Sequence, residues 1–159
     1  MADWLEPGSP APDFTLRTHE DRPLTLASLK GSPVVLYFYP RDDTPGCTKE
    51  ACGFRDAHRR LAEQGATVLG VSPDTPASHT AFRAKHRLPF TLLSDPDHAV
   101  AERYGAWREK NMYGRKSMGI ARSTYVIDGD GRVARVFKAV RPDGHADQVL
   151  EALAALGAS

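Results

Sequence analysis

Residues 34–64 read VVLYFYPRDDTPGCTKEACGFRDAHRRLAEQ, and this stretch decides the fold of the chain. Its first six residues are β-branched, aliphatic or aromatic, which predicts a buried strand over residues 34–39 that Pro40 ends. Residues 44–64 predict a long helix, because apolar side chains recur at steps of three and four until Gly65 stops the pattern: Ala51, Phe54, Ala57 and Leu61. A buried strand that leads through a short polar loop into a long helix is typical of α/β folds.

The patterns outside this stretch alternate between strands and helices. Short strands are predicted over residues 14–17, 24–26, 67–71 and 90–93, and helices over residues 77–86, 99–104 and 146–156. Residues 105–119 are punctuated by glycines and predict a basic loop, whereas residues 124–128 and 132–137 predict a hairpin. The order predicts an α/β fold with a mixed central sheet and helices on both faces, and thioredoxin-like topology is one fold of this kind.

The size and charge of the chain exclude several classes of function. Its 159 residues fit a single domain, residues 1–159, with a core that needs no metal or disulfide. The 21 lysines and arginines balance 20 acidic residues, so a net charge of +1 provides no field to attract nucleic acid or anionic lipid. No apolar run approaches the ~20 residues of a membrane span, and the first residues lack a secretory signal. A cytoplasmic protein without nucleic-acid or membrane partners is expected.

Cys47 is the candidate nucleophile. Thr44 suits the N-cap of the predicted helix and Pro45 its first position, so Cys47 falls in the first turn. There the free backbone amides and the positive end of the helix dipole favour the thiolate, which is the reactive form of cysteine. The alternative is a small cysteine side chain that is only packed at a helix start, and this local context leaves both interpretations open.

The second cysteine, Cys52, follows Cys47 by five residues on the same predicted helix. Helical geometry separates the two Cα atoms by about 8–9 Å, beyond the ~7 Å limit for a disulfide, so the two cannot bond while the helix is intact. The six histidines do not stand at ligand spacing from the cysteines, and no metal or cofactor is expected. A reaction in two steps fits this spacing: one thiolate attacks, and the second thiol resolves the product after the helix start unwinds.

Pro40, Thr44 and Cys47 have the spacing P-x-x-x-T-x-x-C, and residues 44–56 read TPGCTKEACGFRD. The first pattern resembles the active-site motif of the peroxiredoxins, and the second is similar to the signature of their bacterioferritin comigratory protein group, also called the Q type. Further matches to the same group are residues 70–72 with Asp74 and His79, residues 88–90 with 92–95, and residues 119–128, in which Arg122 stands at the place of the family's active-site arginine. The resemblance covers nearly the whole chain and implies a thioredoxin fold.

The resemblance implies a thiol peroxidase that reduces hydrogen peroxide or organic hydroperoxides. It makes Cys47 the peroxidatic cysteine and Cys52 the resolving cysteine, joined in a disulfide that thioredoxin or a similar thiol donor reduces. It also implies that Thr44 and Arg122 hold and polarise the peroxide, and that Pro40 shields the thiolate.

Two other functions would use the same cysteines. A thiol-disulfide oxidoreductase is disfavoured, because that chemistry prefers Cys-x-x-Cys spacing. A peroxide-responsive redox sensor is a protein whose oxidation alters its binding to a partner, and it stays open because the same cysteines would serve it. Turnover distinguishes the two remaining functions: a peroxidase supplied with a donor consumes many equivalents of peroxide, whereas a sensor consumes about one. The chain is expected to act as a monomer.

Overall fold

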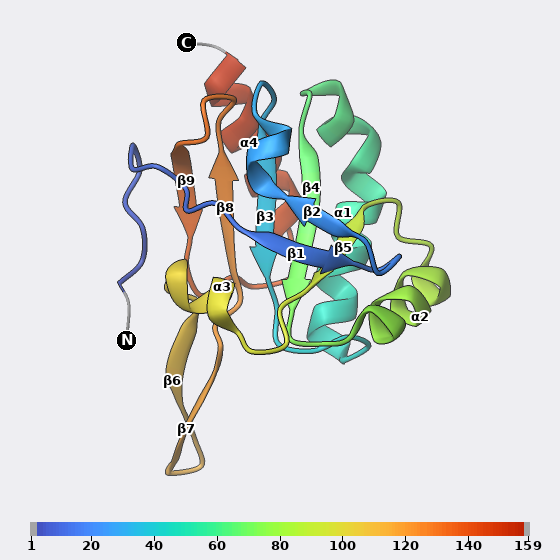
Figure 1. The fold of residues 1–159 in the computed structure, drawn as a ribbon, viewed down its shortest axis with the longest axis vertical. Coiled ribbons are helices and arrows are strands. Elements are labelled where there is room, and N and C mark those ends of the chain that lie inside the picture. Colours follow the sequence, from blue (N-terminus) through green and yellow to red (C-terminus); the bar gives the residue numbers. More distant parts are fainter. Residues whose placement is uncertain (1–2, 158–159) are drawn as a thin grey trace.

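The computed structural model describes residues 3–157 of the chain. A seven-stranded sheet forms its centre, in the order β2-β1-β5-β4-β3-β8-β9 (Figure 1). The strands are β1 (Thr15–Thr18), β2 (Pro23–Thr25), β3 (Val34–Phe38), β4 (Thr67–Ser72), β5 (Thr91–Ser94), β8 (Ser123–Ile127) and β9 (Val133–Phe137). β4 pairs in parallel with both β3 and β5, whereas the other neighbours are antiparallel. The predicted mixed sheet is therefore confirmed.

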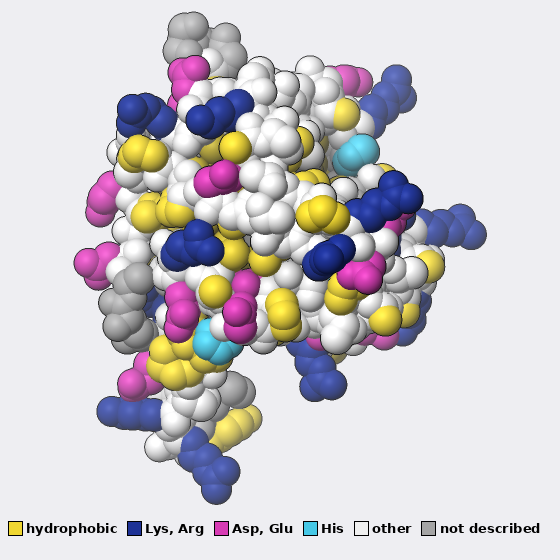
Figure 2. All heavy atoms as spheres, viewed as in Figure 1, with side chains coloured by type: hydrophobic (Ala, Val, Ile, Leu, Met, Phe, Trp, Pro, Cys, Tyr) yellow, Lys and Arg dark blue, Asp and Glu magenta, His cyan; other side chains and the backbone are white. Residues whose placement is uncertain are grey.

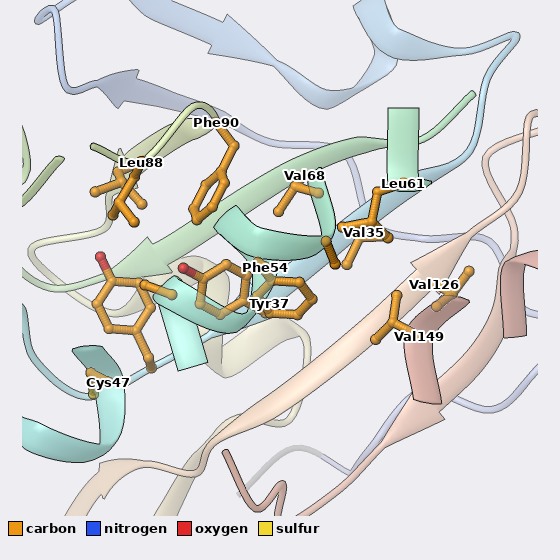
Figure 3. Close-up of a cluster of buried hydrophobic side chains, with 14 of the residues drawn as sticks. Val35, Tyr37, Cys47, Phe54, Leu61, Val68, Leu88, Phe90, Val126 and Val149 are labelled. Atoms are coloured by element: carbon orange, nitrogen blue, oxygen red, sulfur yellow. The ribbon is translucent and has the colours of Figure 1, made fainter. Parts of the chain in front are cut away.

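Helices cover both faces of this sheet. They are α1 (Pro45–Glu63), α2 (Pro76–His86), α3 (Ala99–Arg103), α4 (His145–Gly157) and a 3-10 helix, η1 (Leu26–Leu29). The prediction was wrong at Leu26, which begins η1 instead of ending a strand. α1, α2 and α4 contribute to the core cluster that Figure 3 shows, and α3 and η1 contribute to the second cluster. This arrangement confirms the predicted thioredoxin-like α/β class.

β3 lies inside the sheet, between β4 and β8, and its side chains are apolar on both faces. All five of its residues are buried. Val35 and Tyr37 belong to one core cluster and Leu36 and Phe38 to the other, as the alternation of a strand dictates. Its carboxyl end leads directly into the loop before α1. The loop with the predicted active-site motif therefore starts from a fully buried strand of the sheet.

The largest departure from the prediction is a second, two-stranded sheet. Residues 105–119 are not a loop, because β6 (Trp107–Met112) and β7 (Arg115–Ile120) pair in an antiparallel hairpin that projects from the body (Figure 1). At its tip, Tyr113 and Gly114 have positive φ angles of 55° and 78°, as a two-residue type I′ turn requires. Most described side chains near the tip are exposed, so the apolar alternation that predicts strands is missing.

Charges on the surface are mixed. Figure 2 shows lysine and arginine side chains interspersed with acidic ones over one face of the molecule, in keeping with the net charge of +1. Among the helices that the structure describes, none is long and apolar enough to cross a membrane.

Candidate active site

The first turn of α1 has the geometry that its sequence predicts, with one exception. Thr44 is the N-cap residue and Pro45 the first helical residue. A hydrogen bond from Thr48 N to Thr44 O, at 2.8 Å, begins the helix. The amides of Gly46 and Cys47 precede this first donor and have no acceptor within the helix. The Thr44 side chain does not cap the helix, however, because its hydroxyl donates to Arg41 O at 3.0 Å. The amides of the first turn therefore remain available to an anion bound there.

Cys47 is buried and faces a cation from a distant part of the chain. Its exposed fraction is 2%, and Arg122 Nη2 lies 3.4 Å from its sulfur across a separation of 75 residues. Arg122 follows β7 and directly precedes β8, which pairs with β3, so the sheet brings this arginine beside the start of α1. A guanidinium and free amides next to a thiol favour the thiolate. A cysteine that is only packed in the core would need no such partner.

Glu50 is a residue of the site that the sequence analysis missed. Its Oε1 accepts a hydrogen bond from Arg122 Nη1 at 2.9 Å, while its buried Oε2 has no partner among the described residues. Burial raises the pKa of Glu50 to about 7, although the charge and hydrogen bond of Arg122 act in the opposite direction. The available signal was spacing: Glu50 follows Cys47 by three residues, so the two lie on one face of the helix.

Gly46 also makes room for the arginine, a role that the sequence does not predict. A Cβ atom at this position would lie 3.0 Å from Arg122 Nη2. The guanidinium thus occupies space that a side chain at position 46 would need, which explains glycine in the first turn. Burial lowers the pKa of the Arg122 guanidinium, but the interactions with Glu50 and Cys47 outweigh this effect, and the pKa is raised.

The other two predicted residues lie at the borders of this arrangement. Pro40 is half-buried and follows Tyr39 at the end of β3. Cys52 is partly exposed further along α1, and both cysteines are free thiols. Because α1 runs unbroken through Cys47 and Cys52, its geometry keeps the two sulfurs from bonding in this conformation. The structure therefore brings Arg122 to Cys47 and leaves Cys52 apart.

A buried polar network lies next to the loop that precedes α1. Asp42, Asp74 and His79 bring potential metal ligands within 4.8 Å of one another. Hydrogen bonds already link them, since Asp42 Oδ2 contacts His79 Nδ1 at 2.8 Å and Asp74 Oδ2 accepts from the Asp42 amide at 2.7 Å. The three residues form a hydrogen-bonded network, to which we assign no ion.

The fold and the site define a class of protein: a thiol enzyme of thioredoxin fold in which a buried cysteine in the first turn of a helix contacts an arginine. The AhpC/TSA family matches residues 7–136. A peroxiredoxin bcp of Coxiella burnetii is 51% identical over 146 residues, which cover 92% of this chain and 97% of that relative. Peroxiredoxin Bcp of Bacillus subtilis is 44% identical over 149 residues, covering 94% and 95% of the two chains. The solved structure of Xanthomonas campestris peroxiredoxin Q has a TM-score of 0.86 at 41% identity and covers 89% of this chain and 90% of that one.

The chain belongs to the AhpC/TSA family and, within it, to the bacterioferritin comigratory protein or Q-type peroxiredoxins. It is a thiol-dependent peroxidase of the two-cysteine type, with a peroxide as substrate and a thioredoxin-type reductant. The family and the activity that the sequence resemblance implied are both confirmed.

Proposed function

We propose that Cys47 is the peroxidatic cysteine and that Arg122, Thr44 and the amides of the first turn bind the peroxide. The observation that carries this proposal is the 3.4 Å contact between Arg122 Nη2 and Cys47 Sγ at a helix start. Hydrogen peroxide and organic hydroperoxides share the O–O bond that such a site would attack. Pro40, which precedes the loop, shields the thiolate.

In the first step the Cys47 thiolate attacks one oxygen of the peroxide bond. An S–O bond forms and the O–O bond breaks, so the sulfur is oxidised to a sulfenic acid and the peroxide is reduced to an alkoxide or hydroxide. Arg122 and the amides stabilise the charge that develops on this leaving group before it takes up a proton. Because the Thr44 hydroxyl already donates to Arg41 O, its oxygen accepts the O–H of the incoming peroxide.

In the second step the Cys52 thiolate attacks the sulfenic sulfur of Cys47. An S–S bond forms, and hydroxide leaves and is protonated to water. The two Cα atoms must first come within ~7 Å, so the first turns of α1 unwind locally. A dithiol of the thioredoxin type then reduces the disulfide and becomes a disulfide itself, which restores both thiols.

A coupled assay with thioredoxin, thioredoxin reductase and several peroxides tests these roles. Cys47→Ser is expected to abolish turnover, because a serine hydroxyl is not ionised near neutral pH. Cys52→Ser, the matched variant on the same helix, should still react with about one equivalent of peroxide because only the second step is blocked. Substantial turnover by Cys47→Ser would contradict the assignment. A wild-type protein that consumes only one equivalent in the presence of donor would instead indicate a redox sensor.

We also propose that the protein works as a monomer. Cys47, Cys52 and Arg122 belong to one chain, so the site needs no residue from a partner, and we expect a monomer with one domain over residues 1–159. A reducing compartment such as the cytoplasm suits the two free thiols. Sedimentation analysis of the reduced and oxidised protein tests the oligomeric state, and a stable dimer in either form would contradict it.

A further inference from the structure

The loop between β3 and α1 is anchored by a buried pair of titratable side chains. Asp42 is 8% exposed, and its carboxylate accepts hydrogen bonds from Tyr39 Oη at 2.6 Å and from Ser78 Oγ at 2.8 Å. His79, a fully buried residue of α2, contacts the same carboxylate through Nδ1 at 2.8 Å. Three side chains therefore converge on one aspartate in the loop of the active site.

The contacts of the two ring nitrogens of His79 show how many hydrogens the Asp42–His79 pair shares. His79 Nε2 lies 2.9 Å from Leu93 O, which can only accept, so Nε2 carries a hydrogen. Asp42 Oδ2 also accepts a hydrogen bond from Ser78 Oγ. The contact between Asp42 Oδ2 and His79 Nδ1 holds one hydrogen, which is bonded either to the nitrogen or to the oxygen. The pair is either an imidazolium with a carboxylate or its neutral tautomer, and both forms are directional links between the loop and α2.

A second set of contacts ties the next loop residue to the far end of α2. Asp43 pairs with Lys85 Nζ at 2.7 Å and with His86 Nε2 at 3.1 Å. The loop backbone is held as well, because Asp42 N donates to Asp74 Oδ2 at 2.7 Å. α2 and the segment before it thus fix the loop up to the residue that precedes the N-cap of α1.

We propose that Asp42 and His79 are a positioning pair for the peroxidase reaction. By tying the loop to α2, the pair holds the first turn of α1 closed around Cys47 and slows the opening that the disulfide requires. This inference rests on the proposed function above. The loop continues directly into α1. A loop released from α2 therefore displaces the first-turn amides that act in peroxide attack, and it also removes a restraint on the unwinding that disulfide formation needs. The two steps respond in opposite directions.

Rapid-mixing measurement of both steps tests the pair. In Asp42→Ala, peroxide attack on Cys47 is expected to slow by about tenfold or more, because displaced catalytic groups lose much of their effect. Disulfide formation is expected to become faster. Asp42→Asn keeps the shape of the side chain and can donate to Nδ1 of a neutral His79, so it should bring both rates back towards the wild-type values.

Asp95→Ala is the matched control. Asp95 is also a buried aspartate, 1% exposed, but its carboxylate accepts from the amides of Val100 and Ala101 in α3. Its loss should lower the melting temperature without changing the ratio of the two rates. If Asp42→Ala does not fold, Asp43→Asn replaces it. Position 43 is exposed, and asparagine tolerates its φ of 58° but lacks the negative charge that pairs with Lys85. Asp43→Asn should change both rates in the same directions, but by less.

The outcomes separate the two proposals. Wild-type rates in folded Asp42→Ala, or in Asp43→Asn where it replaces that variant, would overturn the positioning role while the peroxidase assignment stands. An equal change in Asp95→Ala would do the same. A wild-type protein that forms no sulfenic acid at Cys47 would overturn both.

Discussion

Arg122 makes two charged contacts in the site, with Nη2 towards the Cys47 sulfur and Nη1 towards Glu50. Glu50 is buried beside it, and the planar guanidinium fixes the direction of each N–H group. Gly46 leaves the space that the guanidinium fills. The arginine is therefore oriented before a peroxide arrives, which is the condition under which a donor stabilises a transition state most effectively.

Arg122→Ala is expected to slow peroxide attack by about 10²-fold or more, the effect of losing one preorganised donor. The second-order rate constant for peroxide consumption measures this change. Arg115→Ala is the matched control, because Arg115 is an exposed arginine on the projecting hairpin and should be replaceable without loss. A rate within a few-fold of wild type in Arg122→Ala would make Arg122 a structural residue.

Glu50 is expected to give the fold a pH dependence. Its pKa is about 7 in the folded protein against an ordinary value of 4.5, so the folded state binds a proton more readily than the unfolded chain between these values. Its contribution to stability is complete below about pH 4.5 and is lost as the pH rises to about 7. Urea titrations should show this fall in the free energy of unfolding. Glu50→Gln cannot ionise, and an identical pH dependence in this variant would contradict the assignment.

At the scale of the element, α1 combines an ordered first turn with a weak helix further on. A Cβ atom at Gly53 would meet nothing within 4 Å, so no contact requires glycine there. Glycine inside a helix is less favourable than alanine by about 1 kcal/mol. Gly53 therefore lowers the free energy needed to unwind α1 next to Cys52.

Gly53→Ala is expected to slow disulfide formation by about fivefold, because ~1 kcal/mol of added helix stability opposes the opening. Peroxide attack should keep its rate. Gly46→Ala is the matched variant and should act on the other step, since it crowds Arg122 and slows the attack. Timed acid quenching followed by thiol counting measures both steps. Wild-type resolution in Gly53→Ala would show that the opening does not involve the helix at that position.

The unit of strand, loop and helix over residues 34–64 could be predicted because its signals are local. A run of β-branched and aromatic residues, a proline after it and a threonine before the helix all lie within that stretch. The β6–β7 hairpin could not be predicted in this way, because strands that bury few side chains show no apolar alternation. The cap of Thr44 was placed correctly, but its hydroxyl has another acceptor.

Two features of the site could not be predicted, for a different reason. The close approach at Gly46 and the buried ion pair of Glu50 both exist only because β8 brings Arg122 to the start of α1. Such features arise from pairing between distant segments and leave no pattern in one stretch of sequence. The cysteines, by contrast, could be found from their place on the predicted helix and from the resemblance.

At the scale of the whole molecule, the rest of α1 is fixed to the sheet and to the other helices. Phe54 packs with its ring centroid 4.7 Å from that of Tyr37, and both belong to the core cluster in Figure 3. Arg55 Nη1 donates to His86 O at 2.9 Å and so joins α1 to α2. Leu61 is fully buried in the same cluster. Opening of the helix is therefore confined to the turns before Arg55.

Hydrogen exchange should locate this boundary. In the reduced protein the amides of residues 51–54 are expected to be protected, because α1 is continuous there. Oxidation to the Cys47–Cys52 disulfide should remove that protection, while amides near Leu61 keep theirs as an internal control. Equal protection of residues 51–54 in both states, with the bridge confirmed by mass spectrometry, would contradict the unwinding. Covalent dimers as the only oxidised product would contradict the resolving role of Cys52.

The projecting β6–β7 hairpin makes the chain divisible into two complementary fragments. Tyr113 at its tip is fully exposed, and the exposed Arg115 and Lys116 that follow offer trypsin its preferred cleavage sites. A cut there leaves Cys47 on one fragment and Arg122 on the other, while the pairing of β3 with β8 still joins the halves. The nicked protein should migrate as one species until it is denatured. Expressed as separate polypeptides, neither half would carry the complete pair, and peroxide reduction would then report that the two halves have reassembled.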